Sequence, residues 1–122
     1  MNITGTWKVT EVCVFGKDFS RNWRTAEDIL ADSTVSPLQK AFAMAAYQFE
    51  DDGTALSLMP KEVTGGEGEP FDDTYVIAQR TKWKEENGSL FIAALENGED
   101  DWQEMLPAGE GFEVFGYQRI SR

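Results

Sequence analysis

The fold is decided by two short stretches at opposite ends of the chain, GTWKV at residues 5–9 and FGYQRI at residues 115–120. The first begins a run over residues 6–15 that is rich in Val, Thr, Trp and Phe, residue types that favour β-strands. Its apolar residues alternate at first and then do not, which predicts a bulge midway or burial on both faces. The second stretch ends a similar run over residues 112–120. The sequence therefore predicts one long strand at each end of the chain.

Helical signals follow the first of these strands. Ser36 precedes Pro37, and this pair is typical of a helix N-terminus. The apolar residues after it recur at the spacing of one helix face, so we expect a helix over residues 37–46. Residues 25–31 predict a shorter helical segment.

From residue 47 onward, turn signals separate strand-like runs. Two-residue sequences that favour hairpin turns occur at Asp52-Gly53, Asn87-Gly88 and Asn97-Gly98. A further turn is expected over residues 107–111, and the glycine-rich residues 63–70 predict a loose loop. The runs number about eight, at the spacing of an up-and-down barrel or a sandwich. We therefore expect a single, mainly β domain over residues 1–122 with a short helical insert between strands 1 and 2.

Composition narrows the classes of function. The chain carries 22 Asp and Glu against 11 Lys and Arg, a net charge of -11. This charge disfavours nucleic acid and anionic membrane surfaces as partners. Its first reading is solubility, and its second is an acidic face for a basic protein partner. The chain has no His and a single Cys, so we expect no catalytic triad, no metal site and no cofactor.

The sequence carries no membrane or export signal that we recognise. No apolar run approaches the ~20 residues of a membrane helix. The first 20 residues show no basic start followed by an apolar block, as a signal peptide would. A cytoplasmic protein is the default expectation, or an extracytoplasmic one if a leader has been removed.

The two ends of the chain together carry a family resemblance. Gly5 and Trp7 on the first strand, with Arg119 on the last, resemble the signature of the calycin superfamily. This group includes the lipocalins, the fatty-acid-binding proteins and small bacterial lipocalin-like domains. The resemblance implies a closed antiparallel β-barrel in which helices after the first strand cover the lumen. It also implies a structural role for all three residues, with the Arg119 guanidinium stacked on the Trp7 indole.

The family's carboxylate anchor is only half present. Fatty-acid-binding proteins hold a carboxylate with Arg-x-Tyr on the last strand, and the matching positions here are Phe115-Gly116-Tyr117. The tyrosine is kept and the arginine is replaced by phenylalanine. The resemblance therefore implies a neutral or weakly polar ligand oriented by the Tyr117 hydroxyl. Arg80 is the cation that would substitute if it pointed inward.

The expected ligand-binding residues are mostly aromatic side chains on runs that alternate toward the lumen. We expect these ligand-binding residues to be Tyr117, Phe115, Trp83, Trp102, Phe91, Phe49, Phe42 and Arg80. Phe42 belongs to the expected helical lid. In a barrel of eight strands the interior is either packed solid or holds one small ligand. These residues would therefore either fill the interior or contact the ligand.

Three hypotheses for function remain at this point. The favoured one is non-enzymatic binding of a small hydrophobic or lipid-like molecule inside the barrel. The alternative is a protein-interaction or inhibitor module with a side-chain-filled barrel and an acidic surface. The third is an enzyme that uses buried carboxylates with Tyr75 or Tyr117, which would require a bell-shaped pH dependence of turnover.

Overall fold

The computed structural model describes residues 3–15, 21–96 and 99–122. Its strands are β1 Gly5–Phe15, β2 Arg21–Thr25, β3 Ala46–Phe49, β4 Thr54–Pro60, β5 Glu69–Pro70, β6 Tyr75–Glu86, β7 Ser89–Glu96, β8 Glu99–Ala108, β9 Gly111–Val114 and β10 Gln118–Ser121. Its helices are α1 Ala26–Ala31, α2 Pro37–Ala43 and α3 Lys61–Thr64. No helix in these ranges is both long enough and apolar enough to cross a membrane.

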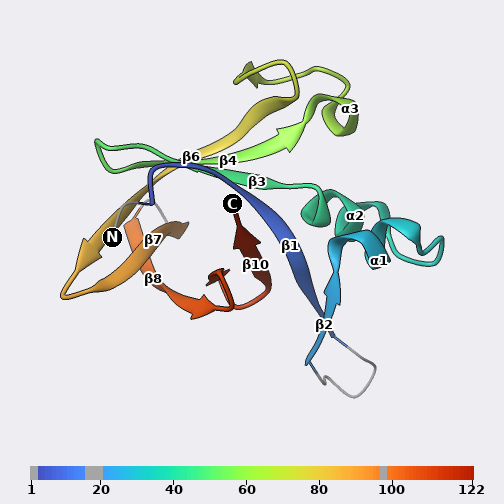
Figure 1. The fold of residues 1–122 in the computed structure, drawn as a ribbon. Helices are drawn as coiled ribbons and strands as arrows, with labels where there is room; N and C mark the ends of the chain where they lie inside the picture. The colour runs from blue at the N-terminus through green and yellow to red at the C-terminus, as the bar shows by residue number, and fades with distance from the viewer. Residues whose placement is uncertain (1–2, 16–20, 97–98) are drawn as a thin grey trace.

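Eight of the strands close into an antiparallel β-barrel. They follow the order β1-β3-β4-β6-β7-β8-β9-β10, and β10 returns to pair with β1 (Figure 1). The two remaining strands lie outside this ring, β2 paired with β1 and β5 paired with β6. The predicted barrel of about eight antiparallel strands is confirmed.

Strand β1 changes partners along its length. Its first half pairs with β3, from Gly5 opposite Phe49 to Lys8 opposite Ala46. Its second half pairs with β2 on that edge, while β10 occupies the other edge. The register with β10 shifts between Val9 and Glu11. This shift is the bulge that the broken alternation of apolar residues predicts.

Both predicted helices form, and each begins at a residue whose side chain caps it. The Thr25 hydroxyl accepts a hydrogen bond from the Asp28 amide at the start of α1, and the Ser36 hydroxyl accepts one from the Gln39 amide at the start of α2. Helix α2 ends at Ala43, three residues before the expected end at residue 46, because Ala46 already begins β3. Both helices lie against β1, as Figure 1 shows, after a β1–β2 hairpin that the sequence did not predict.

Two of the predicted hairpin turns are confirmed. Asp52-Gly53 lies between β3 and β4, and Asn87-Gly88 lies between β6 and β7. Asn97-Gly98 lies outside the described residues, although β7 and β8 pair up to Glu96 opposite Glu99. The expected loose loop over residues 63–70 is wrong in part, because α3 and the short strand β5 occupy its ends.

The expected single last strand over residues 112–120 is wrong. Strands β9 and β10 are antiparallel to each other, with Gln118 opposite Val114, so the chain reverses at residues 115–117. The turn before β9 is also shorter than expected, because Pro107 and Ala108 belong to β8 and the reversal lies at Gly109 and Glu110. The structure therefore has one more hairpin at its C-terminal end than the sequence predicts.

One half of the barrel interior is packed with side chains around Trp7. The Trp7 side chain is 6% exposed, and its indole Nε1 donates a hydrogen bond to the Ile3 carbonyl at 2.8 Å. Its ring centroid lies 5.4 Å from that of Phe112. The Trp7 side chain thus fills this half of the barrel.

The expected stacking of Arg119 on Trp7 is wrong. The arginine over the Trp7 ring is Arg122, at 4.8 Å from the centroid. The Arg119 guanidinium lies 3.9 Å from the ring centroid of Trp23 on β2 and pairs with the Glu11 carboxylate at 2.9 Å. The register explains the difference, because Arg119 lies opposite Glu11, two pairs further along β1 than Lys8, whose partner is Ser121.

Candidate functional site

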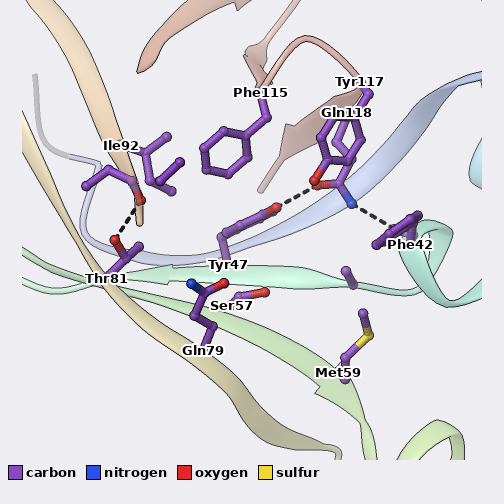
Figure 2. A pocket seen from close by; sticks show the side chains of 13 residues that line it. Phe42, Tyr47, Ser57, Met59, Gln79, Thr81, Ile92, Phe115, Tyr117 and Gln118 are labelled. Carbon is purple, nitrogen blue, oxygen red and sulfur yellow. Dashed lines mark hydrogen bonds between the residues drawn. The ribbon is translucent and has the colours of Figure 1, made fainter. Parts of the chain in front are cut away.

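The other half of the barrel interior contains a cavity of about 370 Å3. On three strands, one inward residue lines the cavity and the inward residue two positions away packs into the core. The cavity-lining residues are Ser57, Thr81 and Gln118, and their core counterparts are Ala55, Trp83 and Ile120. Tyr47 on β3 lines the cavity and also belongs to the core. Phe42 on α2 lines the cavity from the helical side (Figure 2), as does Ala45, two residues beyond the end of that helix.

The cavity meets solvent where β6 and β7 separate. Their pairing runs only from Trp83 opposite Ile92 to Glu86 opposite Ser89. Beyond it, residues of both strands line the cavity, including Gln79, whose side chain is exposed. The Thr81 hydroxyl donates a hydrogen bond to the Ala93 carbonyl at 2.6 Å across this gap.

A buried chain of hydrogen bonds fixes the inner wall. The Tyr47 hydroxyl donates to Oε1 of Gln118 at 2.5 Å, and Nε2 of Gln118 donates to the Phe42 carbonyl at 3.1 Å. Gln118 is 1% exposed, so these bonds satisfy an amide that would otherwise be costly to bury. Together they join β3, β10 and the end of α2 around the cavity.

Both tyrosines of the cavity are neutral at ordinary pH. Burial raises the pKa of the Tyr47 phenol far above its usual range, and the neighbouring Tyr117 adds to this effect. Burial also raises the pKa of Tyr117, which is less deeply enclosed. The cavity therefore offers phenol groups and not phenolates.

The lining is apolar with a few neutral hydrogen-bonding groups. None of the 13 lining residues carries a charge. Ser57 and Gln79 lie directly opposite each other on β4 and β6, and both side chains line the cavity. Such a surface can hydrogen-bond a hydroxyl, carbonyl or amide, whereas a carboxylate would find no cation among these residues.

Aromatic rings form the wall on the side of the β9–β10 turn. The ring centroids of Phe115 and Tyr117 lie 6.3 Å apart with 22° between their planes, and those of Phe42 and Tyr117 lie 5.8 Å apart. Phe115 has φ = 55°, in the left-handed region. A bulky residue held there costs about 1–2 kcal/mol.

The structure brings three of the expected ligand-binding residues to the cavity. They are Phe42, Phe115 and Tyr117. Phe49 and Trp83 are placed instead in the packed half, with their rings edge to face at 6.0 Å. The Trp83 indole Nε1 also donates a hydrogen bond to the Glu50 carbonyl at 2.8 Å. Both residues stabilise the fold rather than line the cavity.

The remaining three expected residues lie on the outside of the barrel. Phe91 and Trp102 flank Lys84, whose ammonium nitrogen is 5.6 Å from the Phe91 ring centroid and 4.4 Å from that of Trp102. Arg80 is half exposed and pairs with Glu69 on β5. Their assignment to the ligand site is wrong, because each lies on the strand face opposite to the lumen.

Several cavity residues were not expected from the sequence. They are Tyr47, Ser57, Met59, Gln79, Thr81 and Gln118. Ser57 and Met59 follow the buried Ala55 at a spacing of two on β4, so all three share one strand face, and this period is the signal that would have found them. Gln118 gives no such signal, because its burial depends on the unexpected turn before β10.

No protein-family model, curated protein or solved structure matches this chain.

Proposed function

We propose that the protein binds a small, neutral, predominantly apolar molecule inside the barrel. The cavity of about 370 Å3 is the observation that carries this proposal, because sites for small molecules typically enclose about 300–1,000 Å3. Burial of ligand hydrocarbon supplies the driving force, roughly 25 cal/mol for each Å2 removed from water. Ser57, Gln79 and Tyr117 supply hydrogen bonds that orient the ligand.

The character of the lining supports a neutral ligand. A carboxylate in this cavity would lose its hydration without gaining a charged partner, which costs several kcal/mol. The net charge of -11 also repels anions as they approach. Fatty-acid-style binding would require a cation in the lumen, and Arg80 pairs with Glu69 outside it.

Binding is proposed in preference to catalysis or to a filled-barrel interaction module. General acid–base catalysis needs a titratable group near neutrality, and the titratable groups of the lining are phenols whose pKa values are raised. The filled-barrel alternative requires a lumen that is packed throughout.

A matched pair of ligands tests the proposal. Calorimetric titration with 1-decanol and with decanoate at pH 8 compares the same chain length with and without a charge. We expect saturable one-to-one binding of the alcohol and at least tenfold weaker binding of the carboxylate, a difference of about 1.4 kcal/mol or more. Tighter binding of decanoate, or no binding of either compound to folded protein, would contradict it.

A further inference from the structure

The β9–β10 turn places an aromatic residue where the backbone favours asparagine. Phe115 and Gly116 have φ values of 55° and 77°, and Asn87 and Gly88 in the β6–β7 hairpin have 55° and 82°. Turns with two consecutive positive φ values favour Asn-Gly strongly. The chain uses that ordinary pair in one hairpin and keeps a strained phenylalanine at the equivalent position of the other.

The strained residue presents its ring to the cavity. Figure 2 shows the Phe115 ring directed inward beside Tyr47, with Tyr117 on the same turn. The turn itself is fixed, because the Tyr117 carbonyl accepts a hydrogen bond from the Cys13 amide at 2.8 Å. Strain that persists in such a setting is a mark of a functional residue.

A polar wall faces these rings across the lumen. Ser57 on β4 and Gln79 on β6 are directly opposite each other in the sheet. In the closed order of eight strands, β4 is four strands from β9, and β6 is four strands from β10. The Phe115 ring and the Ser57–Gln79 pair therefore lie on opposite sides of the cavity.

We propose that the cavity selects a flat aromatic ligand that carries a hydroxyl or carbonyl group. Its ring packs against Phe115, since aromatic rings gain from offset stacking beyond the burial of area. Its polar group hydrogen-bonds to Ser57 and Gln79. This inference rests on the proposed binding function and narrows it from apolar molecules in general to aromatic ones.

Two compounds with the same carbon skeleton test the selection. 2-Naphthol is flat and aromatic, whereas decahydro-2-naphthol has the same carbons and hydroxyl without the flat ring. We expect the wild-type protein to bind 2-naphthol at least fivefold more tightly, although the saturated compound is the more apolar. Equal or reversed affinities, with 1-decanol still bound, would overturn the aromatic selection and leave the proposed function standing. Failure of all three compounds to bind would overturn both.

The variant Phe115→Asn tests the role of the turn. It gives the β9–β10 turn the same Asn-Gly pair that the β6–β7 hairpin has, and it removes the phenylalanine ring. We expect its urea unfolding midpoint to equal or exceed that of the wild type. Its affinity for 2-naphthol should fall at least fivefold, and by a larger factor than its affinity for 1-decanol, which loses apolar contact but no ring stacking. A lower midpoint, or an unchanged affinity for 2-naphthol, would show that Phe115 serves the fold and would overturn the inference. The comparison of 2-naphthol with decahydro-2-naphthol uses only the wild-type protein, so it tests the inference even if Phe115→Asn does not fold.

Discussion

The side chains that line the cavity divide into those that hold the wall and those that face a ligand. Tyr47 and Gln118 satisfy each other at 2.5 Å, so their polar atoms are already committed to the fold. Ser57 has a different position, on β4 between the inward residues Ala55 and Met59 and facing the lumen. We therefore expect substitution of Tyr47 or Gln118 to lower stability, and substitution of Ser57 to weaken ligand binding.

The variant Ser57→Ala removes one hydroxyl from the cavity. We expect the affinity for 2-naphthol to fall by about 0.5–1.5 kcal/mol, the usual net value of one hydrogen bond. The affinity for naphthalene, which lacks the hydroxyl, should stay unchanged. Competition against a fluorescent probe measures both, and equal losses for the two compounds would remove Ser57 from the polar contact.

The variant Tyr47→Phe leaves Oε1 of Gln118 buried without its donor. We expect a loss of about 1–3 kcal/mol in the free energy of unfolding at pH 8. Because the pKa of Tyr47 is raised in the folded state, the unfolded chain releases this proton first, above about pH 10. Wild-type stability therefore falls above that pH, by up to about 1.4 kcal/mol per pH unit from this group, and the variant lacks this part of the fall.

Urea unfolding of both proteins between pH 8 and pH 11 checks this prediction. All other titratable groups are common to both proteins, so their contributions cancel in the difference. The stability difference should shrink as the pH rises above about 10. A difference that stays constant or grows would show that the Tyr47 phenol is not held neutral by the fold.

Few individual site residues were predicted from the local pattern. Phe42 was, because a capped helix carries it to the cavity. Tyr117 was expected from the family resemblance, and the turn that brings it to the cavity was not predicted. Phe91 and Trp102 were misplaced because hairpin register decides which face of a strand points inward. A shift of one residue exchanges the faces, and the sequence of these strands does not specify that register.

At the scale of single elements, the β9–β10 hairpin decides both the closure of the barrel and the site. It is the pair that brings β10 against β1, and its turn carries Phe115 and Tyr117 to the cavity. The sequence suggested one strand here because Phe-Gly-Tyr is not a usual turn sequence. The Asp52-Gly53 and Asn87-Gly88 turns were predicted correctly, since Gly53, Asn87 and Gly88 adopt the positive φ values that such turns need.

Two neighbouring glycines test the importance of this hairpin. A Cβ at Gly111 would lie 1.7 Å from the Ile120 carbonyl oxygen, whereas a Cβ at Gly109 meets nothing within 4 Å. Gly111→Ala should therefore separate β9 from β10 and cost more than about 3 kcal/mol, beyond the range of most single substitutions. Gly109→Ala, at φ = 59°, should cost only about 1 kcal/mol.

Thermal unfolding of the two alanine variants provides the measurement. A much lower midpoint for Gly111→Ala than for Gly109→Ala is the expected result. Similar midpoints would mean that the β9–β10 pairing contributes little to closure of the barrel.

At the scale of the whole molecule, the barrel is half filled. Side chains around Trp7 fill one half, and the other half holds the cavity under α2. The sequence predicted the barrel through strand count, helix caps and the features of its two ends. It did not predict which half would be open, because core residues and ligand-facing residues share one alternating pattern, and only closure of the ring separates them.

A titration with the neutral fluorescent probe N-phenyl-1-naphthylamine shows whether this cavity binds a ligand. The wild-type protein should bind one equivalent more tightly than about 10 µM, or roughly -7 kcal/mol. Ser57→Phe, which places a ring in the cavity, should abolish this binding. Thr6→Phe, which places the same ring on the exposed outer face of β1, should leave it intact. Absence of saturable binding to the folded wild type, or equal binding by both variants, would contradict the account.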